Sequence, residues 1–433
     1  MGFKTFDQVV EYMEHFTNLE RKTDRYSTRT YRLDRMQAIM DTLGNPQRSY
    51  RTIHVAGSKG KGSTASYIAA GLKAVGFRTG LYMSPHVSDY RERFTLCGSF
   101  VPDQDLVDAG NRLASALEGF RFRDSLGESE PTTFELYTAF AFLLFQRLGC
   151  QWAVIETGLG GRLDATNILL PEASVITPIE LEHCDILGDT ISKIAWEKSK
   201  IIKQNRPSFS AFQDPEALAV LRAEALSCSS AFSYLGDHVL HLDQHSVTYS
   251  DGSSFSLNLA MPGLVQAQNC ALAILVLRTL GLFSPSVSLP AMESVALPGR
   301  MERIPWKRTL YLDGAHTQNS MGHLLETFRT LHPTGGVCIF GCVSGKNIDA
   351  MADEVLGCFD RIVVCRPGTY KRSDPQGIFD LLSSRSRQGQ TVVLREDASE
   401  ALKWVLENTT DDEPVLCCGS FYLAGVVKEA LWR

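Results

Sequence analysis

The 433 residues of this chain favour two or three domains, each large enough to bury a sizeable core. Hydrophobic residues make up 44% and charged residues 21%, as in ordinary globular proteins, and the formal net charge is -6. This mildly acidic balance argues against a nucleic-acid scaffold, which usually carries a basic excess. No stretch of about eighteen uncharged apolar residues is present, so we expect no transmembrane helix.

The eleven cysteines bear on the compartment in which the protein works. Their number is odd and their spacing is irregular, and no second Cys or His pair stands near Cys338 and Cys342. We therefore expect reduced, mostly buried thiols rather than disulfides or a structural zinc site. The first residues carry acidic side chains and lack the apolar core of a signal peptide. These features favour a cytoplasmic protein without a membrane partner.

Apolar, β-rich runs alternate with helix-like segments over the first two thirds of the chain. We expect strands at Arg51–Gly57, Gln151–Glu156 and Ala173–Thr177, and helices at Ser63–Val75 and Thr133–Leu148. Strands that alternate with helices predict a mostly parallel sheet covered on both faces. By contrast, Tyr234–Leu259 alternates apolar and polar residues around a Ser-Asp-Gly-Ser turn and predicts an antiparallel hairpin.

A domain boundary is expected between Pro290 and Pro305, where prolines interrupt the pattern. Strand candidates then resume at Thr309–Asp313, Val337–Gly341, Arg361–Cys365, Thr391–Leu394 and Val415–Gly419. We predict an α/β protein with an N-terminal domain, residues 1–297, built on a mostly parallel sheet of P-loop type. A smaller Rossmann-like α/β domain, residues 298–433, would follow it.

The strongest local signal is the segment His54–Thr64, HVAGSKGKGST. A strand ends in a glycine-rich turn and a helix follows, so backbone N–H groups converge beside a positive helix N-terminus. This pattern predicts a nucleotide phosphate loop made of Gly57, Ser58, Lys59, Gly60, Lys61, Gly62 and Ser63, with Lys61 directed at the β- and γ-phosphates. The loop differs from a standard Walker A motif, because only two residues separate Gly57 from Gly60 and Gly62 follows Lys61.

In this form the loop resembles that of the folylpolyglutamate synthase/dihydrofolate synthase family. The related Mur peptide ligases carry Thr where this chain has Gly62. Seven further blocks match the family in order, over nearly the whole chain. They are Ser84-Pro85-His86 with Arg91-Glu92-Arg93, Glu156–Asn167 (ETGLGGRLDATN), Glu182-His183 with Leu187-Gly188, Glu197-Lys198 with Ile201-Ile202-Lys203, Pro298-Gly299-Arg300, Asp313–His316 and Gly419–Leu423.

The resemblance implies an ATP-dependent ligase that joins L-glutamate to the carboxylate of a folate or pteroate through an acyl phosphate. It implies an N-terminal ATP-binding, Mur-ligase-like domain and a C-terminal glutamate-ligase domain. One or two Mg²⁺ ions would act, the first held by Ser84, Glu156 and His183. Lys198 resembles a lysine that is carbamylated in this superfamily, and a carbamate there would hold a second magnesium.

The same resemblance assigns nucleotide-binding and catalytic residues. Asn269 would meet the adenine, Asp313 the ribose and Arg300 the phosphates, while His316 would lie near the phosphates and the acyl intermediate. The expected catalytic residues are therefore Lys61, Lys198, Arg300 and His316. The pattern departs from the family where Glu182 replaces the usual Asp, Ser199-Lys200 replaces Ala-Gly, and Thr317-Gln318 replaces Asn-Pro.

For the folate, the resemblance points to three residues. Phe134 lies in a Thr-Thr-Phe-Glu segment like that of the family and would stack on the pterin ring. Gly158–Asp164 would form a lid, because the adjacent glycines Gly160 and Gly161 allow it to move. Phe134, Gly158 and Asp164 are therefore the expected contacts of the folate substrate.

The preferred interpretation is a bifunctional dihydrofolate synthase and folylpolyglutamate synthase. Its partners would be ATP, L-glutamate and dihydropteroate or reduced folates, without nucleic acid, and we expect a monomer. Three alternatives stay open: a monofunctional folylpolyglutamate synthase, a Mur-type ligase acting on a cell-wall precursor, and a non-catalytic nucleotide-binding relative.

Overall fold

The computed structural model describes residues 2–18, 32–127, 129–369 and 371–431. Contacts divide the chain into two compact units. The first comprises the residues up to His86, Tyr90–Leu259 and Gln266–Val295, and the second comprises Val87–Asp89, Ala260–Val265 and the chain from Ala296 onward. The expected boundary at residues 297 and 298 lies close to the last of these junctions. The two short segments that join the second unit from within the N-terminal part were not predicted.

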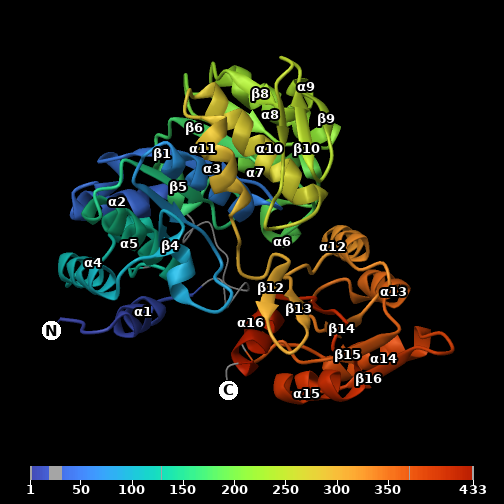
Figure 1. The fold of residues 1–433 in the computed structure, drawn as a ribbon. Coiled ribbons are helices and arrows are strands. Elements are labelled where there is room, and N and C mark those ends of the chain that lie inside the picture. The colour runs from blue at the N-terminus through green and yellow to red at the C-terminus, as the bar shows by residue number, and fades with distance from the viewer. Residues whose placement is uncertain (1, 19–31, 128, 370, 432–433) are drawn as a thin grey trace. The chain divides into compact units, whose positions relative to one another are not determined.

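An eight-stranded sheet forms the centre of the first unit, with strand order β4-β3-β2-β5-β1-β6-β7-β8. Figure 1 labels β1, β4, β5, β6 and β8 of this sheet. All neighbours from β2 to β8 pair in parallel, and β3 and β4 are antiparallel at one edge. The strands are β1 Arg51–Ala56, β2 Thr79–Tyr82, β3 Phe94–Leu96, β4 Ser99–Phe100, β5 Trp152–Glu156, β6 Ala173–Ile176, β7 Ser208–Ser210 and β8 Phe232–Tyr234. The predicted mostly parallel sheet is thereby confirmed.

Helices pack on this sheet, because burying their apolar side chains against it removes apolar surface from water. Four of them share one hydrophobic cluster with Ala153 and Ile155 of β5. They are α1 Phe6–Glu14, α2 Leu33–Leu43, α4 Asp103–Ala116 and α5 Thr133–Arg147. Helix α5 begins at a capping box, in which the Thr132 side chain accepts from the Glu135 backbone and the Glu135 side chain accepts from the Thr132 backbone.

A second set of helices packs elsewhere on the first unit: α6, α7 and α8 share a hydrophobic cluster with Ala56 of β1 and Ile176 of β6, and α11 packs against α3. Helix α3 starts at Lys61, two residues earlier than predicted, and contacts β1, β2 and β5. The set comprises α3 Lys61–Ala74, α6 Cys184–Leu187, α7 Ile191–Ser199, α8 Pro215–Ser227, α10 Leu264–Thr279 and α11 Pro285–Glu293. Short 3-10 turns lie at Pro46–Arg48, Tyr90–Arg93, Asp124–Leu126 and Ala165–Ile168.

The predicted hairpin is a three-stranded antiparallel sheet of order β11-β10-β9. Its strands are β9 Val239–Leu242, β10 Ser246–Tyr249 and β11 Ser254–Ser256. The prediction of an extended chain from Tyr234 onward was wrong for its first residues. There the helical turn α9, Leu235–His238, forms, closed by a hydrogen bond from the Val239 N–H to the Leu235 carbonyl oxygen.

The second unit contains a six-stranded sheet of order β12-β13-β17-β14-β15-β16, parallel except for β12. Alternate residues of β14 enter different core clusters: Cys338 and Phe340 one, Val337 and Ile339 the other. Both faces are therefore buried, and the α/β fold class is confirmed. The strands are β12 Glu302–Pro305, β13 Thr309–Leu312, β14 Val337–Phe340, β15 Arg361–Val364, β16 Thr391–Leu394 and β17 Val415–Cys418. The helices are α12 Gln318–Leu331, α13 Ile348–Cys358, α14 Pro375–Arg385, α15 Ala398–Asn408 and α16 Phe421–Ala430.

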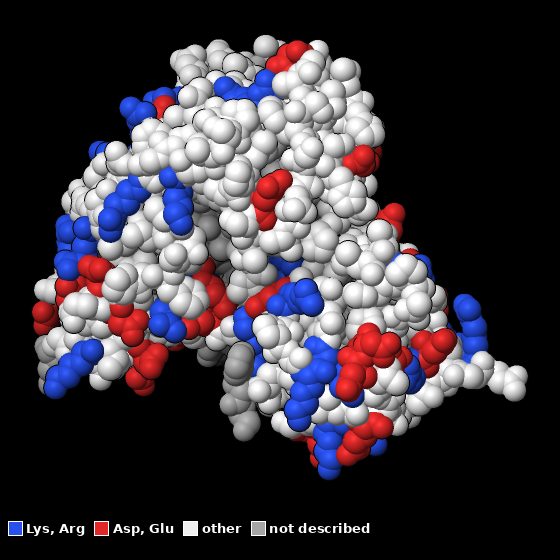
Figure 2. Space-filling view, in the orientation of Figure 1, with Lys and Arg blue, Asp and Glu red and all other residues white. Residues whose placement is uncertain are grey.

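Among the described residues, no helix has both the length and the apolar character that crossing a membrane requires. Basic and acidic side chains are interspersed over the face shown in Figure 2. This mixture agrees with the small net charge of the chain.

Candidate active site

The loop after β1 depends on glycines at two positions. Gly57 has φ +146° and Gly60 has φ +79°. A Cβ atom on Gly57 would lie 1.9 Å from the Thr177 hydroxyl oxygen, and one on Gly60 would lie 2.4 Å from the Asn269 amide oxygen. Neither position therefore accepts a side chain.

The same loop is anchored to the segment that follows β6. The N–H groups of Ser58 and Lys59 both donate to the carbonyl oxygen of Pro178, at 2.9 and 3.2 Å. Helix α3 begins directly after Gly60, and N–H groups in the first turn of a helix have no partner within it. These donors, together with the positive end of the helix, form the surface that suits a phosphate.

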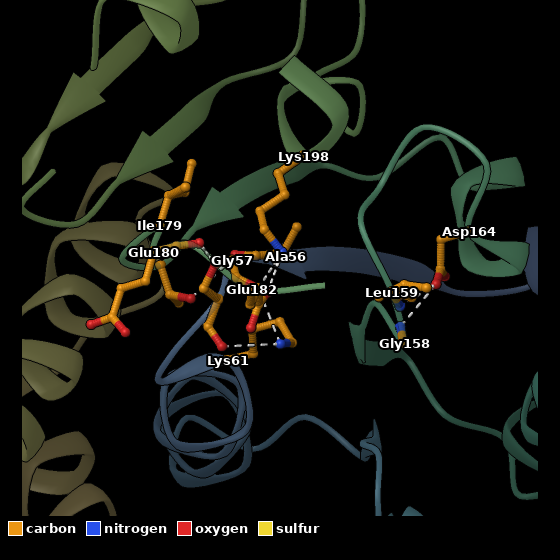
Figure 3. A network of polar contacts seen from close by, with 12 residues as sticks. Ala56, Gly57, Lys61, Gly158, Leu159, Asp164, Ile179, Glu180, Glu182 and Lys198 are labelled. Atoms are coloured by element: carbon orange, nitrogen blue, oxygen red, sulfur yellow. Dashed lines mark hydrogen bonds and ion pairs between the residues drawn. The ribbon is translucent and has the colours of Figure 1, made fainter. Parts of the chain in front are cut away.

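Two lysines converge on the loop, as Figure 3 shows. The Lys61 Nζ donates to the Gly57 carbonyl oxygen at 3.0 Å and lies 4.0 Å from Glu156 Oε1. The Lys198 Nζ donates to the same carbonyl at 2.8 Å and to Glu182 Oε1 at 2.8 Å. Lys198 is only 1% exposed, whereas the Glu182 side chain is 18% exposed, so the lysine end of the ion pair is withdrawn from water and the carboxylate end is only partly so.

Burial and neighbouring charges act against each other in this cluster. Burial lowers the pKa of Lys198, as does the nearby charge of Lys61, whereas Glu182 opposes the shift. Burial alone would raise the pKa of Glu182, but the charges of Lys198 and Lys61 together outweigh it and hold that pKa well below its usual range. Glu182 therefore stays ionised and serves as the counter-ion of Lys198.

The residues expected to hold magnesium are partly brought together. Glu156, at the end of β5, is 5% exposed, and its Oε2 accepts a hydrogen bond from the Ser84 N–H at 3.3 Å. His183 precedes α6 with φ +47° and follows Glu182 directly in the sequence. Among the described residues, no three His, Cys, Asp or Glu side chains gather as a metal site. The Glu156 carboxylate, held next to Ser84, instead suits a Mg²⁺ that would take most of its ligands from phosphates and water.

The Asp164 carboxylate accepts hydrogen bonds from backbone groups in and next to the loop Gly158–Asp164, which we expect to act as a lid. Its Oδ2 accepts from the N–H groups of Gly158 and Leu159, each at 2.9 Å. Its Oδ1 accepts from the Thr166 N–H at 3.0 Å and from the Thr166 hydroxyl. The carboxylate is 3% exposed, and burial raises its pKa. Asp164 thus organises the loop, and a direct contact with the folate stays a prediction.

Two glycines let this loop pack against its neighbours. A Cβ on Gly158 would lie 2.4 Å from the Phe134 ring, and one on Gly161 would lie 2.8 Å from the Glu197 carbonyl oxygen. Phe134 is half-buried at the start of α5. The structure therefore places two of the three expected folate contacts, Phe134 and Gly158, in direct contact with each other.

Asn269 lies against the phosphate loop. Its Oδ1 accepts from the Thr64 hydroxyl at 3.4 Å, and its Nδ2 donates to Gln266 Oε1 at 3.3 Å. The residue is 3% exposed. The Asn269 side chain packs against Gly60 and leaves no room for a side chain there. The expected contact of Asn269 with the adenine stays a prediction.

Arg300, Asp313 and His316 lie together in the second unit. The Asp313 carboxylate accepts from the backbone N–H groups of Met301 and Ala315, both at 2.8 Å, and so joins the two turns that carry these residues. Burial raises the pKa of Asp313, and Arg300 opposes this shift. The His316 Nδ1 lies 2.7 Å from the Gly314 carbonyl oxygen, which places a proton on that nitrogen.

Sequence reasoning missed the pairing of Glu182 with Lys198 and the loop-closing role of Asp164. The two partners of the ion pair are sixteen positions apart, Glu182 in the loop before α6 and Lys198 in α7, so no local pattern joins them. One signal was present: Glu182 departs from the family residue immediately before the expected ligand His183.

Comparison with known proteins covers both units. Residues 55–277 match the Mur ligase middle domain, and residues 299–421 match the Mur ligase glutamate ligase domain. The dihydrofolate synthase/folylpolyglutamate synthase of Bacillus subtilis (strain 168) is 30% identical over 414 residues, 92% of this chain and 94% of that protein. The folylpolyglutamate synthase of Lacticaseibacillus casei is 31% identical over 98% of this chain and 98% of that protein. Crystal structures of the Mycobacterium tuberculosis folylpolyglutamate synthase complexed with ADP and AMPPCP have a TM-score of 0.85 at 26% identity, covering 99% of this chain and 98% of theirs.

Proposed function

The chain belongs to the folylpolyglutamate synthase/dihydrofolate synthase family of Mur ligases, and we propose that it joins L-glutamate to a folate or pteroate carboxylate at the expense of ATP. The observation that carries this proposal is the phosphate loop with Lys61, Lys198 and Glu156 around it. These residues supply the positive charge and the carboxylate that ATP activation of an acid requires.

Activation of the substrate carboxylate by ATP meets an electrostatic barrier. A carboxylate must approach the γ-phosphate of ATP although both are negative, and two unit charges about 4 Å apart repel by ~4 kcal/mol at an effective dielectric of 20. Lys61 and the N–H groups at the start of α3 would offset this repulsion. The resulting acyl phosphate is an electrophile that the amine of glutamate attacks, with release of phosphate.

Magnesium would be held by Glu156 and the Ser84 hydroxyl, with His183 as a further ligand. When bound, it would neutralise phosphate charge and fix the orientation of the triphosphate. Glu156 is suited to this role because β5 and the Ser84 N–H hold its carboxylate beside Gly62 of the loop. A Cβ at Gly62 would already lie 3.4 Å from Glu156 Oε2, so a small residue keeps this space open.

Lys198 is the proposed site of a carbamate that would hold a second magnesium. Carbamylation requires a neutral amine, and burial favours that form. The Glu182 carboxylate favours the ammonium form instead, and it would also repel the carbamate anion. We therefore propose that Glu182 must release Lys198 before the modification occurs.

The remaining residues would bind and enclose the substrates. Arg300 and Asp313 would contact the phosphates and ribose, and His316 would lie near the acyl intermediate. Phe134 and Gly158 would contact the pterin, with Asp164 holding the loop in shape. Asn269 would contact the adenine from its place beside Gly60.

We further propose a monomer that works in the cytoplasm. All eleven cysteines are free thiols, which suits a reducing compartment. Light scattering of the purified protein would test the monomer.

Bifunctionality is proposed because the relatives are named both as bifunctional and as folylpolyglutamate synthases. The deciding experiment measures ADP release with ATP, Mg²⁺ and L-glutamate, adding dihydropteroate in one reaction and tetrahydrofolate in another, with product masses determined. Turnover with both supports the bifunctional enzyme, and turnover with tetrahydrofolate alone supports the monofunctional one.

The same assay addresses the other two alternatives. Activity only with a UDP-sugar peptide would support a Mur-type cell-wall ligase. ATP binding without turnover of any acceptor would support a non-catalytic relative.

A further inference from the structure

The ring of Phe421 lies where three turns of the second unit meet. Phe421 is the first residue of α16 and is half-buried. The Arg300 guanidinium carbon lies 4.2 Å from the centre of its ring. The His316 ring approaches it edge-on, with the ring centres 6.2 Å apart.

Two glycines make this approach possible. A Cβ on Gly314 would lie 2.2 Å from the Phe421 ring, and one on Gly299 would lie 3.0 Å from it. Gly299 and Gly314 are also joined directly, because the Gly314 N–H donates to the Gly299 carbonyl oxygen at 2.9 Å. The ring is thus held against the backbone of both turns that carry the proposed nucleotide contacts.

The packing of Phe421 differs from that of an ordinary core residue. The next apolar residues of α16, Leu423, Ala424 and Val427, belong to a core cluster of the sheet. Phe421 is in neither of these two core clusters of described residues, and it contacts Arg300, His316 and the two glycines. An aromatic face attracts a guanidinium electrostatically, and it also limits the rotamers that the long arginine side chain can adopt.

We propose that Phe421 is a positioning residue for the nucleotide site, which holds the Arg300 guanidinium and the Gly314–His316 turn in the conformation that receives ATP phosphates. The inference rests on the proposed function of Arg300. The aromatic face would be the essential property of Phe421, and its volume would be secondary.

The experiment compares Phe421→Leu, which removes the aromatic face, with Phe421→Tyr, which keeps it. Phe379→Leu serves as a matched control, because Phe379 is another half-buried phenylalanine of the second unit but packs against a core cluster. The affinity for AMPPCP with Mg²⁺ is measured by calorimetry, kcat and KM for ATP by ADP release, and the melting temperature by scanning calorimetry.

We expect Phe421→Leu to weaken AMPPCP binding roughly 3- to 30-fold. Phe421→Tyr should bind like the wild type, and Phe379→Leu should leave the affinity unchanged whatever its effect on the melting temperature. In an Arg300→Ala background, Phe421→Leu should cause a smaller further loss than in the wild type, because the part of its effect that acts through Arg300 is already gone.

Losses that simply add in the double variant, or equal losses for Phe421→Leu and Phe421→Tyr, would overturn the positioning role. This outcome is separate from failure of the proposed function. An inactive wild-type protein would refute the ligase activity, while the AMPPCP measurements would still test Phe421.

Discussion

Lys198 and Glu182 form a partly buried ion pair, with the lysine Nζ 2.8 Å from Glu182 Oε1 and 2.8 Å from the carbonyl oxygen of Gly57. The pair joins α7 to the first glycine of the phosphate loop. The pair holds one anion, Glu182, and one cation, Lys198. A carbamate on Lys198 would replace that cation by a second anion. The charge balance of the loop would therefore change if Lys198 took up the proposed carbamate.

Glu182→Gln should increase carbamylation of Lys198. Loss of the carboxylate removes the main force that raises the pKa of Lys198, so a larger fraction of the buried amine is neutral and adds CO₂ with release of one proton. The measurement is the carbamate signal in ¹³C NMR after addition of ¹³C-bicarbonate. Lys198→Arg provides the control that cannot be modified. Equal signals from the wild type and Glu182→Gln would contradict the competition.

Lys61→Ala should lower kcat/KM for ATP roughly 100-fold, the order of magnitude seen when one donor to a developing anion is lost. The fold should survive, because the Lys61 Nζ donates only to carbonyl oxygens of its own loop among the hydrogen bonds of the described residues. Steady-state kinetics and far-UV circular dichroism separate the two effects. An unchanged kcat/KM would remove Lys61 from the catalytic residues.

The central strands were predictable because they are short apolar runs bounded by turn residues, as β1, β5 and β6 are. The strands β2, β3, β4, β7, β8 and β12 were not predicted, since each mixes apolar residues with polar residues, glycine or proline and shows no continuous apolar run. Pairing also depends on partners far away in the sequence. Thr79 of β2, for example, is aligned with Trp152 of β5.

The candidate active site, like the strands, was predictable only where its residues are contiguous in the sequence. The phosphate loop was visible because its glycines, lysines and flanking elements are contiguous. The start of α3 at Lys61 and the contact of Gly60 with Asn269 required the fold, because α10 reaches the loop only through tertiary packing. The packing of Phe421 against Gly299 and Gly314 likewise required the fold. Phe421 lies more than a hundred positions after both glycines in the sequence, so no local motif indicates the contact.

Asp164→Asn should loosen the loop from Gly158 to Asp164. If the amide nitrogen replaces Oδ2, it faces the N–H donors of Gly158 and Leu159 and cannot accept from them. A fully buried donor left without an acceptor costs about 1–3 kcal/mol, and the partly buried N–H groups of Gly158 and Leu159 should cost less than that. We expect faster hydrogen exchange at both amides and a higher KM for the folate.

Asp243→Asn is the matched control for this change. Asp243 also accepts from two backbone N–H groups, those of His245 and Ser246, but its side chain is 50% exposed. Water can replace a lost acceptor there, so exchange in the Gly158–Asp164 loop should stay at the wild-type rate. Exchange at Gly158 and Leu159 that is the same in both variants would show that Asp164 does not hold the loop.

His54 should make the protein less stable in mild acid. Its Nε2 lies 2.8 Å from the Thr166 hydroxyl, next to Asp164, and burial lowers its pKa from 6.5 to about 3. Between these values the unfolded chain binds a proton at His54 and the folded chain does not. The free energy of unfolding therefore falls as the pH drops from about 6.5 towards 3, by at most about 1.4 kcal/mol per pH unit from this residue.

His54→Gln keeps a polar partner for Thr166 and removes the titration. Urea unfolding at pH 7.5 and pH 5 should show a smaller loss of stability for the variant than for the wild type, because only the wild-type unfolded state gains a proton at this position. If both proteins lose the same amount, the acid sensitivity comes from other groups. In that case the neutral, buried state assigned to His54 would make no contribution to the pH dependence.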